Sequence, residues 1–110
     1  MANVFKNSLT NYIGTIGQVV YSVPSATTTT VIGVSVANVN ANNINVSVMA
    51  RDSSANKTVY LVKDALITPN SSTILVGGEQ KIVLEANDFL SVTSSLGSSA
   101  DVIVSALELS

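Results

Sequence analysis

Alternation of apolar and polar residues with a period of two is the feature that most constrains this fold. It is cleanest between residues 44 and 51, where Ile44, Val46, Val48 and Ala50 are interleaved with Asn45, Ser47, Met49 and Arg51. Successive side chains of a β-strand point to opposite sides. This pattern therefore predicts an antiparallel strand with its apolar set inward and its second set outward.

The segment before it has the same period. Ile32, Val34 and Val36 alternate with small residues, which predicts that these three side chains share the buried face of a strand over residues 31–37. Asparagine dominates the stretch 39–43 that follows. Because Asn tolerates a left-handed backbone and closes local turns, we expect residues 29–51 to form one hairpin.

Short strands separated by turn residues account for the rest of the chain. They are predicted at residues 18–23, 58–63, 73–76, 81–85, 89–94 and 101–109. Residues 3–13 fit an extended arm or a short helical turn equally well. About eight or nine strands with no crossover helix predict an all-β, single-domain antiparallel β-sandwich of jelly-roll or Ig-like type. With 110 residues, we assign 1–13 to an N-terminal arm or first strand and 14–110 to the sandwich domain.

The inward positions of these strands define a predicted core. Its members are Val20, Ile32, Val34, Val36, Val46, Val48, Leu61, Ile74, Ile82, Leu84, Leu90, Val92, Ile103 and Leu107. More apolar residues are present than these faces hold, since residues 59–62 and 74–76 are consecutively apolar. We expect the second faces to contact other chains, the alternative being isolated surface apolar residues. The candidate interface residues are Val4, Phe5, Leu9, Tyr12, Tyr60, Val62 and Leu75.

Composition excludes several kinds of chemistry. The chain has no Cys and no His, which removes the thiolate nucleophile, the zinc–sulfur site, the commonest general base and the Ser–His–Asp triad. None of its seven acidic residues forms a D-x-D or E-x-x-E cluster of the kind that serves acid–base catalysis. We therefore expect no enzyme activity, no cofactor and no metal site.

Charge and hydropathy argue against two further partners. The net charge is −2, and the five cations are scattered among few aromatic residues, so nucleic-acid binding is not expected. Apolar runs are too short to span a membrane. The first residues lack a basic region followed by an apolar one, so we expect synthesis in the cytoplasm without a signal peptide.

Three local motifs have an alternative functional interpretation. Residues 77–81 are Gly-rich but lack phosphate-loop spacing, which favours a turn between strands. Residues 85–88 offer two carboxylates and an amide to calcium but lack the alternating ligand pattern, which also favours a turn. The threonines at 27–30 can display hydroxyls to a carbohydrate or form a solvated strand start.

The order of four motifs carries a resemblance to a known class. They are Thr30-Val31-Ile32-Gly33, Tyr60-Leu61-Val62-Lys63, the run at 77–85 (GGEQKIVLE) and the run at 101–108 (DVIVSALE). The opening Asn3-Val4-Phe5-Lys6-Asn7 and the step Tyr21-Ser22-Val23-Pro24-Ser25 fit the same pattern. Together they resemble small β-sandwich virion structural proteins of tailed bacteriophages, of the type found in phages of marine bacteria, including cyanophages.

This resemblance implies a non-enzymatic particle component. We expect a head decoration, or cement, protein that stabilises the capsid surface, with the residues 1–8 arm contributing to particle binding. Its expected partners are copies of itself, a trimer being favoured, and other virion proteins such as the major capsid protein. The expected location is the virion, on the capsid surface rather than the tail. There are two alternatives. One is a tail, neck or fibre component, such as a receptor-binding knob, and the other is a carbohydrate-binding module.

Overall fold

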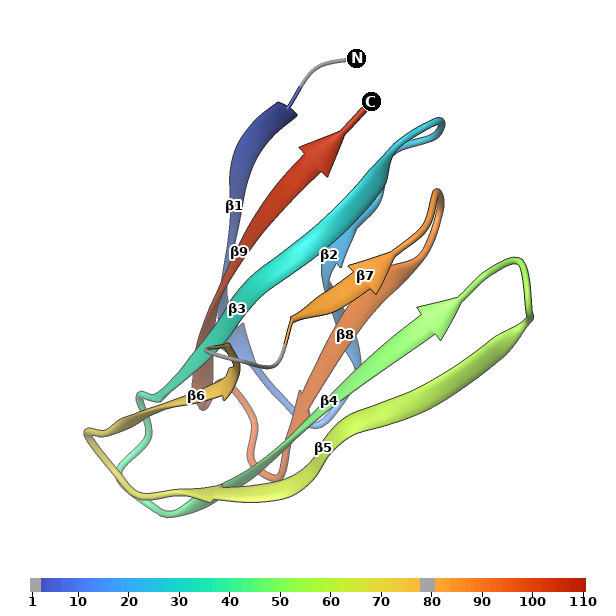
Figure 1. Ribbon diagram of the computed structural model, residues 1–110. Helices are drawn as coiled ribbons and strands as arrows, with labels where there is room; N and C mark the ends of the chain where they lie inside the picture. The colour runs from blue at the N-terminus through green and yellow to red at the C-terminus, as the bar shows by residue number, and fades with distance from the viewer. Residues whose placement is uncertain (1–2, 78–80) are drawn as a thin grey trace.

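The computed structural model describes residues 3–77 and 81–110, which form strands and turns. Within these residues no helix is long and apolar enough to cross a membrane. The strands are shown in Figure 1. They are β1 (Asn3–Ile13), β2 (Gln18–Ser22), β3 (Thr28–Asn38), β4 (Ile44–Asp52), β5 (Lys57–Ile67), β6 (Ser72–Val76), β7 (Ile82–Leu84), β8 (Phe89–Ser94) and β9 (Ala100–Leu109).

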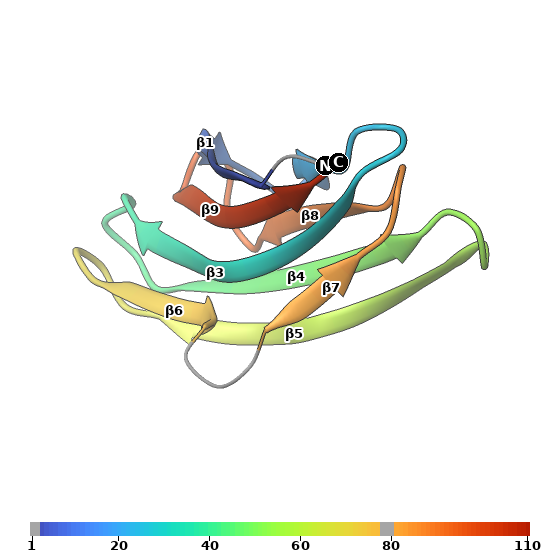
Figure 2. The same cartoon turned by 45° about the horizontal axis from the view of Figure 1, so that its top comes forward.

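The strands form two antiparallel sheets. One is five-stranded with the order β1-β9-β3-β6, and β7 pairs with the same strand β3; the other is four-stranded with the order β2-β8-β4-β5. β6 pairs with residues 34–37 of β3 and β7 with residues 29–31, so the two act as one interrupted strand (Figure 2). The antiparallel β-sandwich predicted from the sequence is confirmed.

Strand pairing is nested, and this decides between the two predicted sandwich types. β1 pairs with β9, β2 with β8, β3 with β6 and β7, and β4 with β5, so each pair encloses the next along the chain. One long hairpin has thus folded over to make two sheets. This connectivity is that of a jelly roll.

The predicted hairpin over residues 29–51 is wrong. Both strands exist, but β3 belongs to the five-stranded sheet and β4 to the four-stranded sheet, so the loop between them crosses from one sheet to the other. Asn38 holds this crossing in place. Its buried side-chain amide donates to the carbonyls of Asn42 and Ile67 at 2.9 Å, and its Oδ1 accepts from the Asn40 amide at 2.8 Å. A period of two reports which face a residue occupies and not which strand it pairs with.

Most of the predicted core is buried between the sheets. Buried residues include Val20, Val34, Val36, Val46, Val48, Leu84, Leu90 and Val92, while Leu61 and Ile82 are partly buried against them. β3 departs from regular alternation at a register shift between Val31 and Gly33, where Ile32 is the extra residue. This bulge turns Val31 inward and leaves Ile32 on the outer side, so the prediction for Ile32 is wrong.

Three other residues predicted to lie in the core do not. Ile74, Ile103 and Leu107 lie outside the core, and their neighbours Val76, Val102, Val104 and Ala106 are buried instead. In β9 both alternating sets are largely apolar, so composition could not tell the inner set from the outer one. In β6 a register shift opposite Val34 and Ser35 moves Val76 inward.

Residues 3–13, open between arm and helical turn in the sequence, form a strand at the edge of the five-stranded sheet. Eight consecutive residues of β1 pair with β9, from Asn3 opposite Leu109 to Thr10 opposite Val102. The two strands run side by side in Figure 1.

Candidate assembly surface

The outer side of the five-stranded sheet carries two rows of apolar side chains. In the first row, Leu9 lies opposite Ile103, Ile103 opposite Ser35, and Ser35 opposite Ile74. Residues opposite one another in an antiparallel sheet share a face. Leu9 is 71% exposed and Ile74 is 72% exposed, so this row points into solvent.

The second row runs parallel to the first, four residues away along β1. Phe5 lies opposite Leu107, Leu107 opposite Thr30, and Thr30 opposite Val83. Phe5 is 76% exposed and Val83 is also exposed. We call the apolar members of the two rows, with Ile32, the outer apolar face: Phe5, Leu9, Ile32, Ile74, Val83, Ile103 and Leu107.

Between the two rows the surface is lower because the side chains are small. Asn7, Ser105 and Gly33 follow one another across β1, β9 and β3. A Cβ atom added to Gly33 would stand 3.3 Å from the Val76 carbonyl oxygen, so a larger residue here would crowd β6. A depression of about 230 Å³ lies over this region, with Ile32, Ile74 and Ile103 among its walls. The face therefore offers ridges and a trough to a partner surface.

The outer apolar face is almost free of charge. Among the described strand residues that pairing places on this side, Asp101 is the only ionisable one. Its Oδ1 accepts a 3.0 Å hydrogen bond from the Tyr12 amide. Covering such a face removes few charges from water, so the desolvation cost is small. Its chemistry suits a packed protein contact.

The candidate interface residues from the sequence fall into three groups. Phe5 and Leu9 belong to the outer apolar face; Val4 and Tyr12 are exposed on the same strand β1 but outside the two rows. Tyr60 is exposed on β5, in the other sheet. Val62 and Leu75 are partly buried and pack against the core.

Sequence reasoning missed Ile74, Val83 and Ile103 as surface residues because it placed two of them in the core and did not single out the third. The only sequence signal for them is that their strands are apolar on both faces. The residues of each row come from strands far apart in the chain, so the rows become visible only with the pairing.

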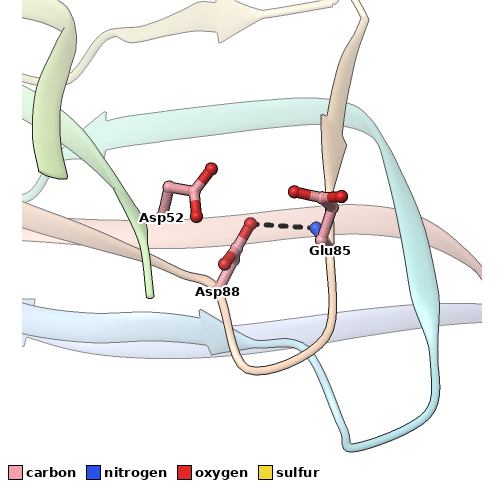
Figure 3. Close-up of side chains that lie close together, drawn as sticks. All are labelled: Asp52, Glu85 and Asp88. Atoms are coloured by element: carbon pink, nitrogen blue, oxygen red, sulfur yellow. Dashed lines mark hydrogen bonds between the residues drawn. The ribbon is translucent and has the colours of Figure 1, made fainter. Parts of the chain in front are cut away.

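Three carboxylates meet where β4 ends, beside the turn that joins β7 to β8. Oxygens of Asp52, Glu85 and Asp88 lie within 4.8 Å of one another (Figure 3). Both oxygens of the buried Asp88 are already engaged: Oδ2 accepts from the Glu85 amide at 2.9 Å and Oδ1 from the Ser53 amide at 3.0 Å. Hydrogen bonds from Ala55 and Ser54 hold the pKa of Asp52 below its usual value. These contacts describe a turn that ties β7 and β8 to the end of β4.

The other two local motifs have different outcomes. Thr27 and Thr29 are buried, and their hydroxyls bond to the Ser25 carbonyl and the Tyr21 hydroxyl, so the threonines at 27–30 do not form a continuous exposed row. Residues 78–80 of the Gly-rich segment lie outside the described residues.

Comparison with known proteins bears on the fold. Neither a protein-family model nor a curated protein matches the sequence. The structure is similar to that of Bacillus endospore appendages, described as a family of disulfide-linked pili, with a TM-score of 0.57 and 7% identity over 98% of this chain and 88% of that one. A chain of infectious bursal disease virus, Gt strain, gives a TM-score of 0.47 and 7% identity over 97% of this chain and 32% of that one. At this identity the first likeness shows a shared fold, and the second carries no further weight.

Proposed function

We propose that this chain is a non-enzymatic structural subunit that packs against neighbouring subunits of a larger particle through the outer apolar face. The observation that carries the proposal is the pair of exposed apolar rows, with Asp101 as the single ionisable side chain among the paired strand residues described on that side. Exposed apolar surface of this extent typically marks a protein contact. A pilus protein with the same fold supports the general idea, although the disulfide linkage of those pili has no counterpart in a chain without Cys.

The specific form that we propose is a decoration protein of a tailed-phage head. It rests on the motif order described above, and the rigid, Cys-free sandwich suits a module held in place by many identical neighbours. The partners in this proposal are other copies of the chain and the major capsid protein. The location is then the capsid surface of the virion.

Charge placed on the outer apolar face tests the general proposal. Ile74→Lys and Leu9→Lys each put a cation where the face packs, and we expect association to weaken roughly 10- to 100-fold, as for a lost buried aliphatic contact. The matched control is Leu66→Lys, since Leu66 is 60% exposed on β5 in the other sheet. Molar mass in solution and binding to particles are the measurements. Equal weakening in all three variants, or in none, contradicts the proposed surface.

Localisation in intact virions tests the specific form. Antibody or gold label against the chain is expected over the head surface. Label confined to the tail would reject decoration in favour of a tail or fibre role, and absence from virions would reject both.

A further inference from the structure

Strand β1 is held in the fold mainly by its backbone. Its residues 3–12 are exposed or half-buried, and Ile13 alone among its described side chains is fully buried. Pairing with β9 runs through eight consecutive residues, and the Ser8 hydroxyl donates a 2.6 Å hydrogen bond to the Val20 carbonyl. A segment that buries so little side-chain surface opens at a lower free-energy cost than the core strands do.

The chain is fixed immediately after this segment. Ile13 is buried, its carbonyl accepts from the Ser99 amide at 2.9 Å, and the Gly14 carbonyl accepts from the Ser94 amide at 2.9 Å. Residues 13–14 therefore anchor the start of the sandwich. What precedes them can move without disturbing the core.

A strained residue lies between the anchor and the paired segment. Tyr12 has φ of 57°, and the register with β9 shifts between Thr10 and Ile13. Left-handed backbone is unfavourable for an aromatic residue and persists only where the surroundings enforce it. Here the Tyr12 amide is held by Asp101. Release of the segment would allow Tyr12 to return to an extended conformation.

We propose that residues 3–10 of one copy exchange onto β9 of a second copy, with Tyr12 as the hinge. The partner is fixed by register: β9 of every copy already has the shape and hydrogen-bonding pattern for this segment. Exchange replaces each β1–β9 pair within a copy by the same pair between copies, and it relieves the backbone strain at Tyr12. The translational freedom that two copies lose on association opposes exchange. At about 3.3 Å per residue, the eight residues of the exchanging segment span roughly 26 Å.

This inference deepens the proposed function, on which it rests, because exchange would link the subunits that the outer apolar face brings together. The two differ in what they require. Packing through the outer face needs the side chains of both rows, and exchange needs the pairing of β1 with a foreign β9. They can therefore fail separately.

Cysteine crosslinking tests the exchange directly, because the chain has no Cys of its own. Asn7 and Ser105 are register partners on the outer side of β1 and β9. A tagged Asn7→Cys chain and an untagged Ser105→Cys chain are co-expressed, purified together and oxidised. Exchange is expected to give a disulfide-linked heterodimer on a non-reducing gel. The matched control replaces Ser105→Cys by Ser35→Cys, on the same outer face but on β3, and is expected to give little.

The outcomes separate the two proposals. Association without the Asn7–Ser105 heterodimer overturns exchange and leaves the outer face standing. Equal heterodimer yield with the Ser35 control also overturns exchange, since it indicates stacked faces. Absence of both association and heterodimer overturns both.

A hinge variant provides a second test that leaves the fold intact. Tyr12→Gly removes the penalty of positive φ, and we expect the heterodimer yield to fall about five-fold because the closed form is no longer strained. An unchanged yield would show that backbone strain at Tyr12 does not drive the exchange.

Discussion

The Tyr21 hydroxyl donates a 2.6 Å hydrogen bond to Oε2 of Glu108 and lies 2.9 Å from the hydroxyl oxygen of Thr29. Tyr21 belongs to β2 in the four-stranded sheet, whereas Glu108 and Thr29 belong to β9 and β3 in the five-stranded sheet. The contact thus joins the two layers at the end where β9 finishes. Burial of the phenol, reinforced by the Glu108 carboxylate, raises the pKa of Tyr21 to about 12.

Stability is expected to fall at alkaline pH through Tyr21. Its pKa is raised from 10.0 to about 12 in the folded protein, so its contribution is complete below pH 10 and is lost as the pH rises towards 12. At pH 8, Tyr21→Phe should cost roughly 1.5–3 kcal/mol, as for a hydrogen bond to a charged group. Urea unfolding of both proteins from pH 8 to 12 should show the difference shrinking above pH 10. A constant difference would contradict this.

Removing the Asn38 side chain is expected to loosen the crossing between β3 and β4. Asn38→Ala leaves the Asn42 and Ile67 carbonyls without this donor, and we expect a loss of about 2–3 kcal/mol in the free energy of unfolding. The control is Asn42→Ala, which removes only an exposed side chain and keeps the backbone carbonyl, with an expected change under about 0.5 kcal/mol. Equal effects of the two would show that Asn38 does not secure the loop.

We expect the cluster of Asp52, Glu85 and Asp88 to stabilise a turn and not to bind a cation. Asp88→Ala should destabilise the protein by about 2–3 kcal/mol, because the Glu85 and Ser53 amides lose their acceptor. Glu85→Gln, which changes an exposed carboxylate only, should have little effect. Thermal unfolding with and without millimolar calcium should give the same midpoint. A rise of several degrees that Glu85→Gln abolishes would instead indicate a cation site.

Association through the outer apolar face should be nearly insensitive to salt. Asp101 is the only ionisable side chain among the paired strand residues described on that side. Added salt therefore has few charge–charge interactions to screen at this face. Between 50 and 500 mM NaCl we expect the association constant to change by less than about two-fold. Sedimentation equilibrium measures it. A ten-fold weakening would indicate an interface built on ion pairs elsewhere.

Periodicity was sufficient to predict the layers of this fold and insufficient to predict its connections. The inward set of β4 follows the alternation read from residues 44–51, and β8 spans the predicted residues 89–94. Sheet membership could not be derived, because the alternation in β3 is compatible with pairing to β4 or to β9. The bulge at Ile32 could not be predicted either, since one extra apolar residue between Val31 and Gly33 does not change the composition of the strand.

The candidate surface was only partly predictable. An excess of apolar residues signalled that some faces are not covered, and Phe5 and Leu9 were identified on that ground. Ile74 and Ile103 were assigned to the core because a residue with apolar neighbours on both sides gives no indication of which way it points. Their shared row depends on pairings between strands far apart in the chain.

The nested pairing has a consequence for how the protein is made. Of the described strands, β1 leaves the ribosome first and β9 last, yet the two lie side by side, and β9 also separates β1 from β3. The five-stranded sheet is therefore incomplete, and the two apolar rows do not exist, until β9 has emerged. Contacts of such large sequence separation form late and slowly. The outer apolar face, through which we propose that subunits pack, is therefore complete only after every strand from β1 to β9 has been synthesised.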